Sequence, residues 1–272
     1  MLNNSLIPTT ANYVQQGTGT PVIMIHGLAA SLHDWDDLIP ELTVHGYACY
    51  APDLLGHGES PKPEARAYQM DWIFEHFFQW MESLHLAEPA VLIGHSLGGR
   101  LALEYARHVP AATRGLVLVN PFYSPFQLPL LLRETYRRTN LGKLAVHQLP
   151  ERLFRFLVDV SSVAMGHRTG ALHSLPEKVR AQTALDYKRT APGVYHIPNA
   201  ISDMTEYLSQ IDVPALVVWG DRDPTLAPAS FSRVVEALPK ARGETLHAGH
   251  VPHQSHAAAF NRIVMKFLKE LP

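Results

Sequence analysis

The 272-residue chain has a single cysteine, Cys49, and no apolar run approaching the ~20 residues that a membrane-spanning helix requires. One cysteine forms neither an internal disulfide nor a thiolate metal site, and the hydrophobic neighbours of Cys49 predict a buried thiol. Basic residues are not in excess either. Lys and Arg total 23 against 25 Asp and Glu, a net charge of −2, which argues against a nucleic-acid partner.

The first eight residues contain neither the positive charge nor the apolar stretch of a secretory signal. We therefore expect a cytoplasmic protein without a membrane span. The composition, 46% hydrophobic and 18% charged, excludes intrinsic disorder and predicts a large core. The sequence leaves open whether the protein is a monomer or a homodimer.

Short apolar runs alternate with segments of helical periodicity, which is the pattern of an α/β fold. Runs that are apolar on both faces predict a parallel sheet covered by helices. Strands are predicted near residues 22–25, 48–51, 90–93, 116–119 and 215–219, and helices near 34–45, 69–86, 97–108, 229–238 and 255–270. Tyr13 and Val14, followed by Gly17 and Gly19, predict an antiparallel edge hairpin before the parallel strands.

Residues 122–205 contain no strand-like run and are rich in helical Leu and Phe patterns. They predict a helical cap inserted into a core made of residues 1–121 and 206–272. Residues 121–205 hold 11 Lys and Arg against 6 Asp and Glu. We interpret this excess as solvated helix faces; the alternative is a role in steering anionic substrates. We expect an apolar cavity lining from a few of the cap residues Leu130, Leu131, Leu132, Phe154, Phe156, Leu157, Val160 and Met165, whose commoner role is to pack the cap helices together.

The strongest motif is Gly-His-Ser-Leu-Gly-Gly at residues 94–99, directly after a predicted strand and directly before a predicted helix. It matches Gly-x-Ser-x-Gly, a sharp turn that presents a nucleophilic serine at the edge of a sheet. The motif predicts Ser96 as the nucleophile, with His95 in a supporting role. The amide of Leu97, at the start of the helix, is then placed to stabilise an oxyanion.

A serine hydroxyl needs a base and an acid, and both are expected downstream in the order Ser, Asp, His. Asp223 follows the last long apolar run, and His250 lies 27 residues further on. Asp221, in the same loop as Asp223, is a rival acid. Asn120 follows an earlier strand, but its amide cannot stabilise an imidazolium as a carboxylate does. Ser96, Asp223 and His250 are the predicted catalytic residues.

His247, His250, His253 and His256 recur every third residue, a spacing that raises the possibility of a metal site. Gly249 and Pro252 break any continuous helix through them, and no carboxylate lies among them. We therefore predict no metal and interpret His253 as a supporting residue.

The loop after the first parallel strand is predicted to supply the second oxyanion donor. Gly27 allows its backbone to curl toward Ser96, so that the amide of Leu28 points at the developing charge. His26 is expected to support this loop through hydrogen bonds. The Gly-rich residues 53–60 lack the Gly-Lys-Ser/Thr of a phosphate loop, and we interpret them as a turn in which Asp53 and Ser60 join loops.

Together these motifs resemble the α/β-hydrolase superfamily, in particular its serine esterase- and lipase-like branch with a helical cap. The resemblance is carried by residues 26–27, 53–60, 94–99, 219–223 and 249–253. It implies a carboxylic ester hydrolase of small to medium substrates with apolar groups, working through an acyl-enzyme and without a cofactor. It disfavours haloalkane dehalogenases and epoxide hydrolases, which have an aspartate where this chain has Ser96.

Two other readings stay open. A C–C bond hydrolase or a lactonase uses the same three catalytic residues, although the Gly-rich loop of meta-cleavage product hydrolases is missing after Gly27. Some proteins with this fold are instead ligand-binding homologues with weak or no catalysis, because a fold does not determine function.

Overall fold

The computed structural model describes the chain except for residues 1–7, 9, 65–66, 131–132, 135–148 and 170–174, and except for the side chains of residues 164–169. Its described strands form one seven-stranded sheet in the order β1-β3-β2-β4-β5-β6-β7. The strands are β1 (Tyr13–Gln16), β2 (Thr20–Ile25), β3 (Tyr47–Pro52), β4 (Ala90–His95), β5 (Thr113–Val119), β6 (Ala215–Gly220) and β7 (Ala241–Leu246).

All neighbouring strands run parallel except β1, which is antiparallel to β3. The mostly parallel α/β sheet is therefore confirmed, but the edge hairpin is wrong, since β1 does not pair with β2. Gly17 and Gly19, with φ of +77° and +111°, pack against backbone atoms of Tyr47 and Gly46. The chain thus crosses the start of β3 on its way from β1 to β2.

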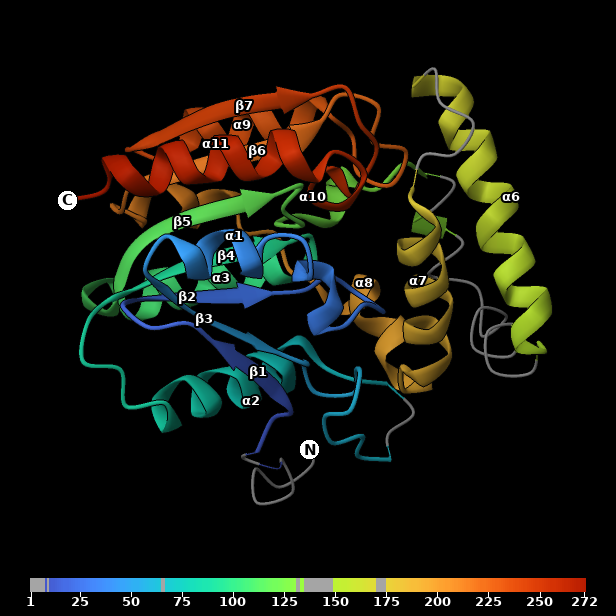
Figure 1. Ribbon diagram of the computed structural model, residues 1–272, viewed down its shortest axis with the longest axis horizontal. Coiled ribbons are helices and arrows are strands. Elements are labelled where there is room, and N and C mark those ends of the chain that lie inside the picture. The colour runs from blue at the N-terminus through green and yellow to red at the C-terminus, as the bar shows by residue number, and fades with distance from the viewer. Residues whose placement is uncertain (1–7, 9, 65–66, 131–132, 135–148, 170–174) are drawn as a thin grey trace.

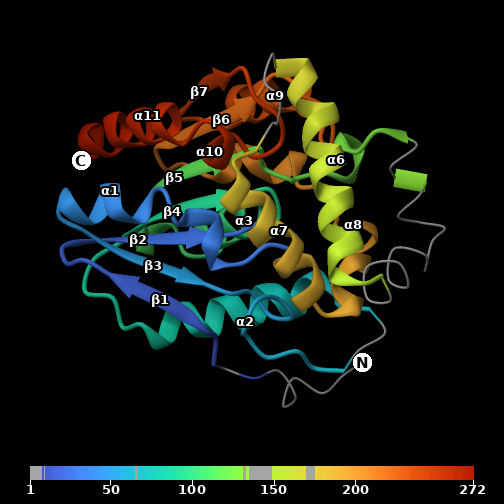
Figure 2. The ribbon, with the colours of Figure 1, turned by 45° about the vertical axis from the view of Figure 1, so that its right-hand side comes forward.

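Helices cover both faces of the sheet (Figures 1 and 2). The described α-helices are α1 (Ile39–Val44), α2 (Met70–Ser83), α3 (Leu97–His108), α6 (Glu151–Thr169), α7 (Glu177–Arg189), α8 (Ile197–Ala200), α9 (Ala229–Ala237), α10 (Pro252–Ser255) and α11 (Ala257–Glu270). Alternate residues of a strand point to opposite faces. Ile23 of β2 accordingly packs in the layer with α2, α3 and α9, whereas Val22 packs with α1 and α11.

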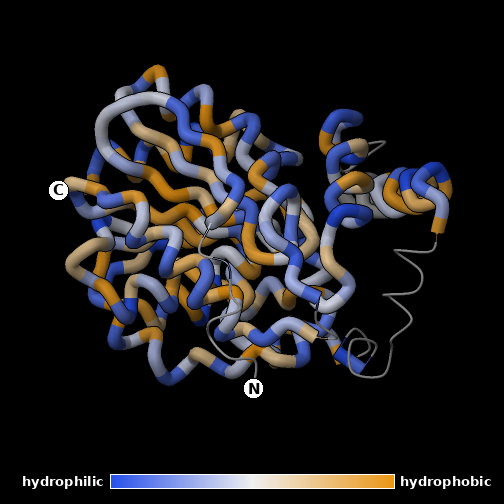
Figure 3. Tube along the Cα trace, turned by 90° about the horizontal axis from the view of Figure 1, so that it is seen from below, coloured by the Kyte–Doolittle hydropathy of each residue, from blue (hydrophilic) through white to orange (hydrophobic). Residues whose placement is uncertain are grey.

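The central strands are the hydrophobic interior of the molecule, as the orange segments in Figure 3 show. From β2 the chain passes outward to β3 on one side, and from β4 it passes to β5 on the other. The neighbours β2 and β4 therefore flank a topological switch point, where open α/β sheets bind their ligands at the carboxyl ends of the strands. The loop after β2 and the turn after β4 both begin at this point.

Between β5 and β6 the described residues form helices and turns but no strand. Figure 1 shows α7 beyond the carboxyl ends of the strands and α6 on its outer side. The hydroxyl of Ser31 donates to Asp186 of α7 at 2.9 Å, and α7 also forms ion pairs from Lys178 to Asp37 and from Arg189 to Glu59. We call residues 122–205 the cap segment; its division from the core as a separate domain stays a prediction.

Candidate active site

Ser96 lies in a strained turn between β4 and α3, with φ of +51° and ψ of −109°. Its N–H donates to the carbonyl of Val119, and its own carbonyl accepts from the N–H of Phe122, both at 2.9 Å. A Cβ on Gly98 would lie 2.0 Å from the carbonyl oxygen of Ile25, so only glycine fits there. The turn is thus held between the ends of β2 and β5, with the Ser96 side chain on a cavity.

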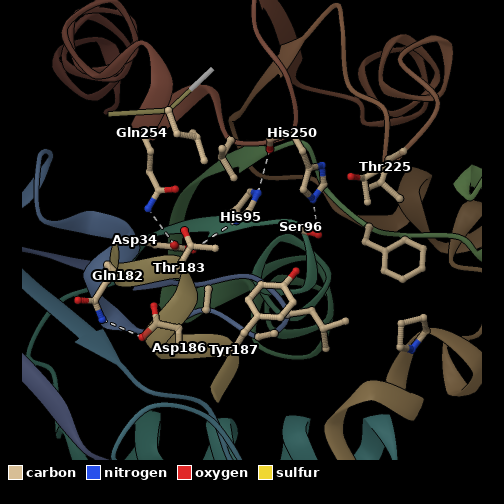
Figure 4. A pocket seen from close by; sticks show the side chains of 18 of the residues that line it. Asp34, His95, Ser96, Gln182, Thr183, Asp186, Tyr187, Thr225, His250 and Gln254 are labelled. Carbon is tan, nitrogen blue, oxygen red and sulfur yellow. Dashed lines mark hydrogen bonds and ion pairs between the residues drawn. The ribbon is translucent and has the colours of Figure 1, made fainter. Parts of the chain in front are cut away.

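His250 bridges the other two predicted catalytic side chains. Its Nε2 is 3.1 Å from Oγ of Ser96, and its Nδ1 is 2.7 Å from Oδ2 of Asp223. Because Asp223 accepts at Nδ1, the neutral ring carries its proton there and leaves Nε2 free to accept a proton from the serine. The structure therefore brings Ser96, His250 and Asp223 together in hydrogen-bonding order, as Figure 4 shows for the first two.

Asp223 is buried, and its carboxylate is fully supplied with donors. Oδ1 accepts from the N–H groups of Thr225 and Leu226 at 2.7 and 3.0 Å, and Oδ2 also accepts from Nδ2 of Asn120 at 2.7 Å. Burial alone would raise the pKa of Asp223, but the charge and hydrogen bond of His250 and these donors lower it below its usual value. Asp223 is thus suited to remain ionised beside an imidazolium.

The rival acid, Asp221, points elsewhere. It contacts the exposed His247 at 3.1 Å and not His250. Asn120, which the sequence offered as an acid position, is a donor to Asp223 instead. The choice of Asp223 over both agrees with this geometry.

The loop after β2 lies against the turn that carries Ser96. Nε2 of His26 accepts the N–H of Leu54 at 2.9 Å, and its Nδ1 is 2.7 Å from the carbonyl of Gly27, so His26 supports the loop as expected. A Cβ on Gly27 would lie 2.7 Å from Nδ1 of His95. Leu28 lines the same cavity as Ser96.

Leu97 is buried as the first residue of α3, where an N–H has no carbonyl partner within its own helix. The oxyanion roles of the Leu28 and Leu97 amides stay predictions.

Asp53 and Ser60 join loops in the way that the sequence predicts. Asp53 accepts from the N–H groups of Leu32 and Glu59, each at 2.8 Å, and from Nδ2 of Asn12 at 2.7 Å. Ser60 donates to the carbonyl of Asp53 at 2.6 Å. This turn is a structural support beneath the loop after β2.

The structure adds Asp34, which the sequence analysis did not identify. Its carboxylate accepts from the N–H of Gly27 at 3.3 Å, from Gln254 at 3.1 Å, and lies 3.4 Å from Nδ1 of His95. Nε2 of His95 in turn donates to the carbonyl of His250 at 3.0 Å. Although burial raises the pKa of Asp34, His95 and the neighbouring histidines lower it to about 2.

This network connects both loops that flank Ser96. No motif marks Asp34, because its partners come from distant parts of the chain.

Asp34, His95 and His253 form a buried group whose ligand atoms all lie within 4.8 Å of one another. Within the described chain these are the side chains that could hold a metal ion. His253 packs against Trp35 with 4.9 Å between ring centroids, and neither of its ring nitrogens has a hydrogen-bond partner. The supporting role of His253 and the absence of a metal both stay predictions.

Ser96 and His250 open onto a cavity of about 290 Å³. Figure 4 shows Asp34, Gln182 and Asp186 on one side of Ser96 and Thr225 on the other. The described lining residues are Leu28, Ala29, Ala30, Asp34, His95, Ser96, Phe122, Leu128, Leu175, Gln182, Thr183, Asp186, Tyr187, Pro198, Thr225, Leu226, His250, Val251 and Gln254.

The expected cap lining is wrong where it can be examined. Leu130, Phe156, Leu157 and Val160 are exposed, whereas Phe154 is buried against Tyr187. Leu131, Leu132 and the side chain of Met165 lie outside the described residues. The reason is that α7 lies between α6 and the sheet, so α7 and not α6 supplies the wall over Ser96.

Residues 20–257 match the alpha/beta hydrolase fold family, and the chain belongs to that family. It is 25% identical over 240 residues to Lipase 3 of Moraxella sp. (strain TA144), covering 86% of this chain and 73% of the lipase. It is also 25% identical over 256 residues to the pimeloyl-[acyl-carrier protein] methyl ester esterase of Aeromonas salmonicida (strain A449), covering 93% of this chain and 96% of the esterase.

Among solved structures, a bromoperoxidase from Bacillus anthracis superposes with a TM-score of 0.80 at 24% identity, covering 95% of both chains. This likeness extends the agreement in fold over nearly the whole chain. In the part of the chain that the structure describes, no helix is both long enough and apolar enough to cross a membrane.

Proposed function

We propose that this alpha/beta hydrolase is a serine hydrolase that cleaves carboxylic esters through a covalent acyl-enzyme. The observation that carries the proposal is the hydrogen-bonded series from Asp223 through His250 to Ser96, which opens onto a cavity. The similarity to a lipase and to a methyl ester esterase supports ester substrates. The cavity size suits a small to medium ester.

In the proposed reaction, Nε2 of His250 takes the proton of Ser96 while the serine oxygen attacks the ester carbonyl. The resulting oxyanion accepts hydrogen bonds from the amides of Leu28 and Leu97, and loss of one such donor raises the barrier by about 3–4 kcal/mol. Asp223 fixes the tautomer of His250 and stabilises its positive charge.

His250 then gives its proton to the leaving alcohol, which leaves an acyl group on the serine oxygen. A water molecule enters, and His250 takes one of its protons as the water oxygen attacks the acyl carbon. Breakdown of the second tetrahedral intermediate returns the proton to Ser96 and releases the acid. Every proton transfer uses a group of the chain or the entering water.

The test is hydrolysis of p-nitrophenyl butyrate together with labelling by a fluorophosphonate probe. We expect a burst of nitrophenolate and a covalent adduct on Ser96. Ser96→Ala should keep the circular dichroism of the folded protein, lose labelling, and lose activity by about 10⁴-fold or more. Full esterase activity in Ser96→Ala would overturn the assignment, and silence of the wild type in both assays would favour a ligand-binding homologue.

A panel of lactones and a vinylogous diketone, assayed beside the p-nitrophenyl esters, separate ester hydrolysis from lactone opening and from C–C bond hydrolysis. We expect the highest kcat/KM with an ester. A preference for C–C cleavage or lactone opening would keep the three catalytic residues but change the substrate class.

A further inference from the structure

The cavity beside Ser96 has a polar end formed by side chains of the cap segment and of the 3₁₀ helix Leu32–Trp35. Gln182, Thr183 and Asp186 of α7 face this end together with Asp34 (Figure 4). Leu128, Phe122 and Leu226 give other parts of the wall an apolar character. A substrate held at Ser96 therefore meets a polar and an apolar environment in the same cavity.

The carboxyl group of Asp186 is only partly occupied by protein donors. Its Oδ2 accepts from the hydroxyl of Ser31 at 2.9 Å, and its Oδ1 accepts from Nε2 of Gln182 at 2.8 Å. A carboxylate offers about four acceptor positions on its two oxygens. Acceptor capacity thus remains on a residue that lines the cavity.

This end of the cavity carries two acidic side chains. Asp34 and Asp186 line the cavity, and no lysine or arginine is among the described residues that line it with them. Asp34 holds a pKa of about 2 and is ionised at neutral pH. Burial raises the pKa of Asp186 to about 7, and the negative charge of Asp34 raises it further, whereas His33 and the two hydrogen bonds act in the opposite direction.

Two acidic side chains with no lysine or arginine among the described lining residues favour a cationic ligand and disfavour a carboxylate. An ammonium group suits this environment better than a hydroxyl, because it supplies three donors and a compensating charge. None of the described lysines and arginines of the cap segment lines the cavity. Arg180, for example, is bound to Asp159 and Glu177 and does not line the cavity.

We propose that the polar end of the cavity binds an ammonium group carried by the ester substrate, with Asp186 and Asp34 as its acceptors. The proposal rests on the serine hydrolase function above and adds a substrate class to it: esters with an amino group remote from the reacting carbonyl. Asp186 is then a specificity-determining residue, in addition to joining α7 to Ser31.

The test compares methyl esters of equal chain length that differ only in the charge of the far end. They are methyl 6-aminohexanoate, methyl heptanoate and monomethyl adipate, which end in an ammonium, a methyl and a carboxylate group. We expect kcat/KM to fall in that order, with the ammonium ester preferred over the methyl-terminated ester by about tenfold or more.

Asp186→Asn tests the residue itself, because an asparagine can still contact Ser31 and Gln182 but carries no charge. The ratio of kcat/KM for the ammonium ester over methyl heptanoate should fall about tenfold. Asp37→Asn is the matched control. It also removes one acidic charge and one contact between α7 and the core, with Lys178, but Asp37 does not line this cavity, so the ratio should stay as in the wild type.

An equal ratio in wild type and Asp186→Asn, or a preference of the wild type for monomethyl adipate, would overturn the ammonium site. If Asp186→Asn does not fold, the order of the three esters in the wild type decides alone. Turnover of methyl heptanoate without preference for the ammonium ester contradicts only this proposal. Failure to hydrolyse any of the esters, together with no fluorophosphonate labelling, contradicts the proposed function as well.

Discussion

Asp223 and Asp221 lie in one loop, and comparing their substitutions tests which of them is the catalytic acid. Asp223 accepts Nδ1–H of His250, so Asp223→Asn would face that nitrogen with an amide and favour the tautomer whose Nε2 carries the proton. Such an Nε2 cannot take the proton of Ser96, and kcat should fall on the order of 10⁴-fold.

Asp221→Asn is the matched control, because Asp221 contacts only the exposed His247 among the histidines of this loop that the structure describes. Its kcat should remain within about twofold of the wild type, as expected for a surface change. Steady-state kinetics on p-nitrophenyl butyrate measures both variants. Equal losses would mean that the acid has been assigned wrongly.

The reactivity of Cys49 is a second prediction for a single residue. The thiol is completely buried in β3, and burial raises its pKa to about 12. Since the thiolate is the reactive form, the folded protein should not react with Ellman's reagent. Unfolding in guanidinium should release one thiol per chain. Rapid reaction of the native protein would show that β3 opens far more readily than its packing indicates.

The start of α3 is the element on which the nucleophile depends. Gly98→Ala would place a Cβ 2.0 Å from the carbonyl oxygen of Ile25, against backbone at the end of β2. The turn must then move, so we expect a loss of about 2 kcal/mol or more in the free energy of unfolding and weaker activity. Thermal and urea unfolding measure the stability.

Gly249→Ala is the control for that substitution. Gly249 also lies in a loop of the site, but a Cβ there meets no atom within 4 Å. The free energy of unfolding should change by less than about 1 kcal/mol. Similar losses in the two variants would contradict the close approach of α3 to β2.

The elements that could be predicted from the sequence are those in which burial or backbone conformation restricts the residue types that fit. β2, β4 and β5 are apolar on both faces because helices cover both, and the turn at Ser96 needs glycines on either side, so both appear in the sequence as patterns. β7 was not predicted as a strand, because it lies at the sheet edge with half-exposed and exposed side chains and has no apolar run.

The cavity wall was predicted from the wrong helix for a related reason. The apolar residues Phe156, Leu157 and Val160 of α6 are exposed, whereas the wall is made by Gln182, Thr183 and Asp186 of α7. Hydrophobicity marks what a helix could bury but does not reveal which helix lies nearest the sheet. Asp34 was missed likewise, because its three partners come from the loop after β2, the end of β4 and α10.

For the molecule as a whole, Asp186 couples folding to pH through the contact between α7 and the core. Its pKa is raised from 3.8 to about 7 in the folded chain, mainly by burial and further by Asp34. The stabilisation that Asp186 contributes is therefore fully present at a pH below 3.8, its pKa in the unfolded chain. This stabilisation is lost as the pH rises toward about 7, the pKa of Asp186 in the folded chain, because the unfolded chain then releases a proton that the folded chain keeps.

Buried histidines have the opposite effect. Burial lowers the pKa of His57 to about 3 and also lowers that of His76, so their contributions are lost as the pH falls below the unfolded value of 6.5. The contribution of Asp186 is isolated by subtracting the stability of Asp186→Asn from that of the wild type at each pH, since the histidines are common to both chains.

Urea unfolding at pH 5 and pH 8 should then show that the wild type loses about 2 kcal/mol more than Asp186→Asn between these two conditions. One pKa unit corresponds to about 1.4 kcal/mol, and partial solvation reduces the full effect. Asp37→Asn, which loses a different contact to α7, should follow the pH dependence of the wild type. Parallel curves for wild type and Asp186→Asn would mean that Asp186 titrates alike in the folded and unfolded chains, and the acidic end of the cavity would then carry a full negative charge throughout this pH range.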